Sequence, residues 1–193
     1  RSLLGLEEDA EKLAVYCEEA MKLTIEVADR ADRVSLLYLD GDLGLNVMAK
    51  DSYHSEVVDL LTDNLAVIDN ASGKGLGNEV DMEQLLNWNP DCIIFAPQSF
   101  YPYVAEEKEW QGMKAVREGN YYEVPYGPYN WMGTPPSCQR YLGMLWLAKL
   151  LYPDLADYDL YEEAREFYSL FIHYDLDRDT FDLLVAESVG KNK

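Results

Sequence analysis

The sequence predicts an α/β fold: a Rossmann-like three-layer sandwich with a mostly parallel central sheet, preceded by one long helix. The first observation is that short apolar runs alternate along the 193 residues with longer segments of helical periodicity. Second, runs such as 92–95 have no polar face, which is typical of parallel strands covered by helices on both sides. Third, residues 6–32 contain neither glycine nor proline, so one uninterrupted helix can open the chain.

The first expected element is the helix over residues 6–32. The apolar residues that recur at spacings of three and four, and therefore share one helix face, are Leu6, Ala10, Leu13, Cys17, Ala20, Thr24, Val27 and Ala31. At about 1.5 Å of rise per residue the helix is roughly 40 Å long. A helix of this length is typical of an element that bridges or braces two parts of a protein.

The remaining elements follow from the same periodicities. Asp81, with Gln84 three positions later, has the spacing of a capping box and marks the start of a helix that ends before Asn89 and Pro90. The four expected strands span residues 34–39, 65–68, 92–95 and 121–124. The five further helices are expected at 53–62, 81–88, 136–151, 160–171 and 178–189.

Composition excludes several classes of partner. The chain has 36 acidic and 16 basic residues, a formal net charge of −20, and no local basic cluster, so we do not expect nucleic acid binding. Cys17, Cys92 and Cys138 are too few and too widely spaced for a disulfide framework or a zinc site, and the first two are expected to be buried. No apolar stretch approaches the ~20 residues of a membrane span, and we expect no signal peptide in this sequence.

The segment PYGPYNWMGTPPS, residues 125–137, is unusual for such an acidic chain. Residues 124–139 carry no charged side chain and hold four of the eight prolines, which fix the shape of a loop. This loop follows the last expected strand, and parallel sheets bind ligands beyond the carboxyl ends of their strands. Aromatic and amide side chains there offer stacking and hydrogen bonds, although the aromatic ones could instead pack in the core. The candidate ligand-binding residues in such positions are Tyr53, His54, Gln98, Tyr101, Tyr129, Asn130 and Trp131.

Three motifs resemble chemical signatures, but each is incomplete. Segment 73–78 ends in Asn78 where a dinucleotide-binding fingerprint has glycine. Segment 175–186 lacks the glycine and the final glutamate of a calcium loop, so Asp177 or Asp179 is expected to cap a helix. Ser52 and His54 have no orienting acid placed by any motif. We therefore predict no catalytic residues, no metal-binding residues and no cofactor.

The run VDMEQLLNWNPDCII, residues 80–94, resembles a signature of the C-terminal lobe of class III substrate-binding proteins. These proteins serve ABC importers of iron-siderophores, haem, cobalamin and some metal or oxyanion cargoes. Further matches lie at residues 110–125, 145–149 and 151–153, so the resemblance covers nearly the whole chain. It implies that residues 1–32 form a long interlobe helix and that residues 33–193 form the C-terminal lobe, with the N-terminal lobe absent from this chain.

The resemblance also implies roles for individual residues. Glu83 matches a glutamate that docks this lobe onto the membrane permease. Tyr38 matches an aromatic position that faces the ligand, and Asn130 and Trp131 match a ligand-contacting turn.

The function implied by the resemblance is that of an extracytoplasmic solute-binding protein, periplasmic or held at the cell surface by a lipid anchor outside this chain. Its partners would be ABC permease subunits, and its ligand an iron or other metal chelate. The loops contain few arginines, and Lys50 and Lys74 are the only nearby cations expected, which favours a neutral or cationic chelate. Corrinoid, haem and oxyanion remain alternative cargoes. An enzyme or a protein-interaction domain that uses the same cleft remains an alternative function.

Overall fold

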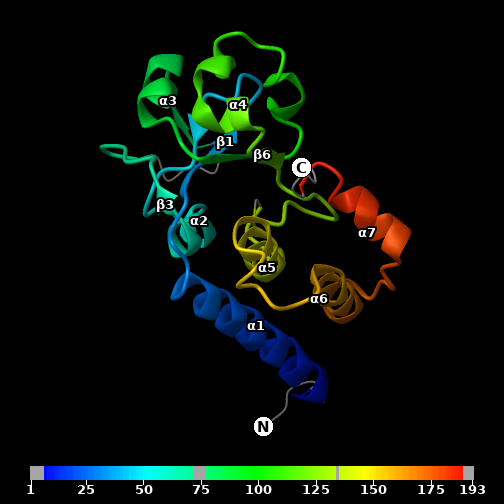
Figure 1. Cartoon of the computed structure of the whole chain (residues 1–193). Coiled ribbons are helices and arrows are strands. Elements are labelled where there is room, and N and C mark those ends of the chain that lie inside the picture. Colours follow the sequence, from blue (N-terminus) through cyan, green and yellow to red (C-terminus); the bar gives the residue numbers. More distant parts are fainter. Residues whose placement is uncertain (1–6, 72–76, 134, 189–193) are drawn as a thin grey trace.

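A computed structural model describes residues 7–71, 77–133 and 135–188, and its fold is the predicted α/β class. The strands are β1 (Ser35–Asp40), β2 (Asn46–Val47), β3 (Asp63–Asn64), β4 (Asn78–Glu79), β5 (Cys92–Phe95) and β6 (Tyr121–Glu123). They form one sheet in the order β4-β2-β1-β5-β6, and β3 also pairs with β1 (Figure 1). Strands β1, β3, β5 and β6 are parallel, whereas β2 and β4 extend the sheet in antiparallel pairings.

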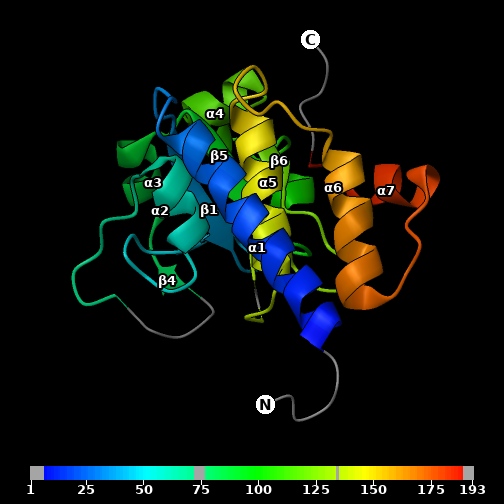
Figure 2. The ribbon, with the colours of Figure 1, turned by 90° about the horizontal axis from the view of Figure 1, so that it is seen from below.

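Helices cover both faces of the sheet, so the fold has three layers (Figure 1). The first layer contains α2 (Glu56–Leu61), α5 (Gln139–Leu151), α6 (Leu160–Phe167) and α7 (Arg178–Leu184), and α1 (Glu7–Ala28) lies on the outer side of α2 and α5 (Figure 2). The second contains α3 (Met82–Trp88), α4 (Lys114–Glu118) and two 3-10 turns, Tyr101–Tyr103 and Trp110–Gly112. Successive strand residues point to opposite faces. Leu36 and Tyr38 accordingly belong to the core of the first layer, and Leu37 and Leu39 to that of the second.

The long first helix is confirmed, but its buried face was predicted in part wrongly. Helix α1 ends at Ala28 and packs against α2 and α5 (Figure 2). Leu13 and Cys17 are only half-buried, whereas Tyr16 is buried. The reason is that Tyr16 packs its ring against Phe167, at the end of α6, and its hydroxyl donates a hydrogen bond to the carbonyl oxygen of Glu163 at 3.2 Å.

Both predicted helix caps are confirmed, and one predicted strand is wrong. The side chain of Asp81 accepts a hydrogen bond from the Gln84 N–H at 2.8 Å, and that of Asp177 accepts one from the Thr180 N–H at 2.7 Å. The predicted strand 65–68 is replaced by β3, two residues earlier, because β2 occupies the carboxyl half of the same edge of β1. Val67 is accordingly 69% exposed.

Several short elements escaped prediction. Strands β2 and β4 and helix α4 are too short to show a periodicity. The predicted helix 160–171 is divided into α6 and a π-helical turn, Tyr168–Ile172. Cys92 is buried as expected. Within the described part of the chain, none of the helices has the length and apolar character that crossing a membrane requires.

Candidate ligand-binding site

The loop after β6 is held in one shape by hydrogen bonds to a single carbonyl group. The carbonyl oxygen of Gly127 accepts bonds from Trp131 Nε1 at 3.2 Å, from Gln139 Nε2 at 2.6 Å and from the Tyr168 hydroxyl. The backbone N–H of Tyr129 in turn donates to Gln139 Oε1 at 2.9 Å. The uncharged loop is therefore a rigid wall fixed to α5 and to the segment after α6.

Three residues predicted in or near this wall lie behind its surface. Tyr38 and Trp131 are 0% exposed and Asn130 is 4% exposed. Asn130 Nδ2 donates to the Tyr38 hydroxyl at 3.0 Å, and Asn130 Oδ1 accepts the Met132 N–H at 2.7 Å. In this chain these side chains join the wall to β1, whereas Tyr129, 49% exposed, lies on the outside.

A pocket of about 280 Å³ lies beside β2, at the carboxyl edge of the sheet, where the uncharged loop also lies. Residues 48–54 line one side of it, and Ala71, Gly77 and Asn78 line another. It brings together two predicted residues, Tyr53 and His54, with the predicted cation Lys50. Lys74, the other predicted cation, lies outside the described residues.

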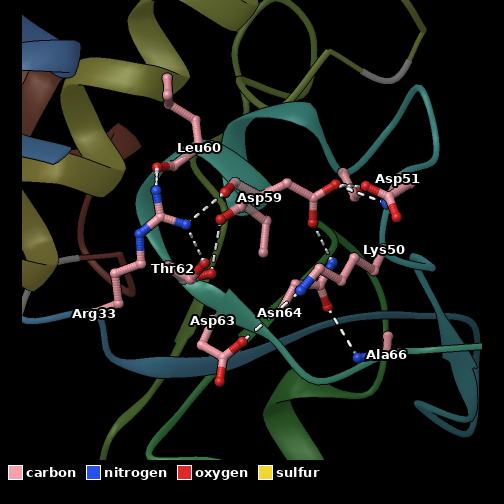
Figure 3. A network of polar contacts seen from close by, with 11 residues as sticks. Arg33, Lys50, Asp51, Asp59, Leu60, Thr62, Asp63, Asn64 and Ala66 are labelled. Carbon is pink, nitrogen blue, oxygen red and sulfur yellow. Dashed lines mark hydrogen bonds and ion pairs between the residues drawn. The ribbon is translucent and has the colours of Figure 1, made fainter. Parts of the chain in front are cut away.

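A network of polar contacts fixes the loop that carries Tyr53 and His54 (Figure 3). The carboxylate of Asp59 accepts hydrogen bonds from the Asp51 N–H at 2.9 Å, the Ser55 hydroxyl at 2.6 Å and Asn64 Nδ2 at 2.7 Å. Asp51 has a φ of 62°, a left-handed conformation that non-glycine residues rarely adopt. The hydrogen bond from its N–H to Asp59 helps to hold that conformation.

Helix α2 beneath this loop is closed at its carboxyl end by Arg33. The guanidinium donates to the carbonyl oxygens of Asp59 at 3.2 Å, Leu60 at 3.1 Å and Thr62 at 3.3 Å (Figure 3). These carbonyls have no partner within the helix, and a cation is favourable at this end of the helix dipole. The pocket is thus built on a helix with a fixed end.

Arg140 is a cation at this site that the sequence reasoning missed. Its guanidinium carbon lies 4.3 Å from the centroid of the Tyr53 ring, and Nη1 forms an ion pair with Glu56. The rings of Tyr53 and His54 meet edge to face, with centroids 5.5 Å apart. Arg140 lies in the first turn of α5, just after the uncharged loop, and this position is the signal that could have drawn attention to it.

Gln98 and Tyr101 form a separate group on the β5–β6 side of the edge. The Gln98 N–H donates to Glu123 Oε1 at 3.1 Å, and the Tyr101 hydroxyl donates to Glu187 Oε2 at 2.7 Å. Burial raises the pKa of Glu123, and the charge of Glu187 adds to the effect. Burial and the bond to Glu187 likewise raise the pKa of Tyr101. The predicted residues therefore divide between this acidic group and the pocket beside β2.

Two further predictions concern metals and the permease. Within residues 7–71, 77–133 and 135–188 there is no group of three or more His, Cys, Asp or Glu side chains that could hold a metal ion. Glu83 is exposed in the first turn of α3, on the second helical layer. Its side chain is therefore accessible to a partner.

The chain thus has an α/β fold preceded by one long helix, with a pocket beside β2 and a rigid aromatic loop after β6. The chain belongs to the Periplasmic binding protein family, whose family model matches residues 2–126. It is 29% identical over 96 residues to the molybdate-binding protein MolA of Haemophilus influenzae, a match that covers 48% of this chain and 27% of MolA.

Solved structures show the same fold over most of the chain. An ABC transporter solute binding protein from Sulfurospirillum deleyianum is 31% identical, with a TM-score of 0.80 over 93% of this chain and 55% of that one. A periplasmic solute binding protein from Veillonella parvula is 26% identical, with a TM-score of 0.76 over 93% of this chain and 56% of that one. The chain thus spans about half the length of these two proteins.

Proposed function

We propose that the chain is the ligand-binding lobe of the solute-binding component of an ABC import system. In this proposal residues 1–32 supply an interlobe helix and residues 33–193 supply one of the two lobes that enclose a small solute. The observation that carries the proposal is the combination of family membership with a pocket at the carboxyl edge of the sheet. The coverage of about half of each solved relative supports a partner lobe across that pocket.

The cargo we propose is an iron chelate or a related metal complex, with an oxyanion as the alternative. Tyr53, His54 and Lys50 line the pocket and offer stacking, hydrogen bonding and positive charge to such a solute. The name of MolA, a relative at 29% identity, states that it binds molybdate, which is an oxyanion. This name supports an oxyanion as the alternative cargo.

The proposed partners are the membrane subunits of the permease, and the proposed location is extracytoplasmic, with any lipid anchor outside this chain. Membership of the Periplasmic binding protein family supports both. Glu83 is the proposed docking residue, since it is exposed and already near the positive end of a helix, where a carboxylate is favourable.

Solute binding is tested by titrating the full-length protein, with the proposed partner lobe in place, with iron chelates, haem, corrinoids and oxyanions while following tryptophan fluorescence. Trp131 lies directly behind the aromatic wall, so a bound solute is expected to change its emission. A Trp131→Phe variant shows how much of the change in tryptophan emission comes from Trp131. A flat response across the whole panel would contradict the proposed function.

Docking is tested in cells with Glu83→Arg, which should abolish uptake of the solute found in the titration without weakening its binding. Glu19→Arg makes the same charge change on an exposed position of α1 and serves as the matched control. Equal uptake by the two variants would remove the docking role of Glu83.

A further inference from the structure

We propose that His54, Ser137 and Arg140 form an anion-binding subsite at the edge of the pocket. The subsite would take an oxygen-rich anionic group of the solute, either an oxyanion or a carboxylate of a metal chelate. This inference rests on the proposed solute-binding function and specifies the chemistry of the cargo. It also reverses the preference for neutral or cationic cargo that the sequence suggested.

The first support is a concentration of unpartnered polar atoms. Among the described residues, the buried side-chain atoms that lack a hydrogen-bond partner are His54 Nδ1, Ser137 Oγ and Arg140 Nη2. The residues that carry these atoms are neighbours: the backbone N–H of Arg140 donates to the Ser137 carbonyl oxygen at 3.3 Å, and both Arg140 and His54 contact the ring of Tyr53. A buried polar group without a partner costs about 1–3 kcal/mol. A ligand that pairs with all three atoms would recover this free energy.

The second support is the charge of the cluster. Arg140 supplies a guanidinium whose planar N–H groups match the spacing of two oxygens on one anion. Its side chain is only 12% exposed, so an anion held there would be partly shielded from water. The first turn of the 13-residue helix α5 adds its positive end, and Lys50 lies on the nearby wall of the pocket.

The third support is the way the guanidinium is held without a ligand. Glu56 pairs with Nη1 and leaves Nη2 unpaired. The Tyr53 ring covers the guanidinium at 4.3 Å. Tyr53 is 56% exposed and the Glu56 side chain 54% exposed, so few packing contacts oppose their movement. An entering anion can therefore displace the Tyr53 ring and accept hydrogen bonds from Nη2 and from the Ser137 hydroxyl.

The subsite is tested by NMR titration of the ¹⁵N-labelled chain with three probes. Sodium molybdate represents an oxyanion, gallium(III) citrate an anionic carboxylate chelate, and gallium(III) desferrioxamine a cationic hydroxamate chelate. We expect molybdate or the citrate complex to shift the backbone amide signals of Ser137 and Arg140 and the ring signals of His54. A response to molybdate alone supports an oxyanion cargo, and a response to the citrate complex alone supports an anionic chelate.

Substitutions localise the binding. Arg140→Gln should raise the Kd of the active probe about tenfold to a hundredfold, as expected for lost hydrogen bonds to a charged group. Ser137→Ala removes a single hydroxyl with little risk to folding and should raise the Kd about three- to tenfold. Arg165→Gln makes the same charge change on α6, away from the pocket, and should bind like the unsubstituted chain.

The outcomes separate this inference from the proposed function. If the cationic chelate shifts the pocket signals and neither anionic probe does, the subsite is refuted and the solute-binding function stands. If Arg140→Gln and Ser137→Ala both bind the active anion as tightly as the unsubstituted chain, the subsite is also refuted. If all three probes and the wider fluorescence panel give no response, both proposals fail.

Discussion

Replacing Gly143 by alanine should force apart helix α5 and the aromatic wall. A Cβ atom at this position would lie 2.2 Å from the carbonyl oxygen of Trp131 and 2.8 Å from its carbonyl carbon. Nonbonded carbon and oxygen atoms normally stay more than 3 Å apart, so the backbone of the wall must move by roughly 1 Å. A flexible side chain could rotate away from such a contact, but a backbone carbonyl cannot.

The expected loss of stability is about 2 kcal/mol. Overpacking a tightly filled interior costs about 1–3 kcal/mol, and the rigid contact at Gly143 places it near the upper end of that range. Alanine recovers about 1 kcal/mol through its better helix propensity. The displacement would also reach the Asn130–Tyr38 hydrogen bond, because Asn130 directly precedes Trp131 in the chain.

Urea unfolding followed by far-UV circular dichroism measures the free energy of unfolding, and tryptophan fluorescence reports on the wall. Gly112→Ala is the matched control, because its Cβ would meet the end of the Leu86 side chain at 2.6 Å, and that side chain can rotate away. The control should lose less than about 1 kcal/mol. If Gly143→Ala is as stable as the control and its tryptophan emission is unchanged, the close contact between α5 and the wall is refuted.

Two further predictions concern polar contacts at the site and elsewhere in the fold. Asp59→Ala should lower the free energy of unfolding by about 1–3 kcal/mol and speed hydrogen exchange at the Asp51 amide, because three donors lose their acceptor. The hydrogen bond from Lys114 lowers the pKa of Asp91, so its stabilisation is present above about pH 4 and is lost as the pH falls through the folded-state pKa. Burial raises the pKa of Glu123, so its ionisation destabilises the fold once the pH rises above the unfolded value. Urea unfolding across pH should therefore show Asp91→Asn less stable and Glu123→Gln more stable than the unsubstituted chain at pH 7. The first difference should shrink as the pH falls through the lowered pKa of Asp91, and the second should vanish below the ordinary pKa of glutamate.

The sequence predicted the strands that are buried on both faces. Residues 36–39 of β1 and all four residues of β5 are apolar and buried because helices cover both faces of these strands, and this leaves a clear signal. Strands β2 and β4 contain two residues each and depend on pairing with β1 and with each other. Their composition therefore carries no periodicity, and nothing in the sequence predicted them.

The sequence predicted which loops form the site, but it did not predict the charged residue Arg140 there. Tyr129 and Trp131 belong to the same aromatic segment, yet one is 49% exposed and the other 0% exposed. Which aromatic residue forms the surface depends on where the backbone turns, and composition does not reveal this. Arg140 acts on the site through its contacts with Tyr53 and Glu56, more than 80 positions earlier in the chain. Such a contact exists only after folding.

An anion subsite is physically compatible with a chain whose formal net charge is −20. At physiological ionic strength the Debye length is about 8 Å, so distant surface carboxylates contribute little at the pocket. Contacts within about 4 Å are far less screened, particularly where the cation is only 12% exposed. An anion that pairs with Arg140, Ser137 and His54 would gain several hydrogen bonds at once, whereas an anion that fits poorly would gain none of them. In such a protein the binding of an anion depends on the geometry of one site and not on net charge.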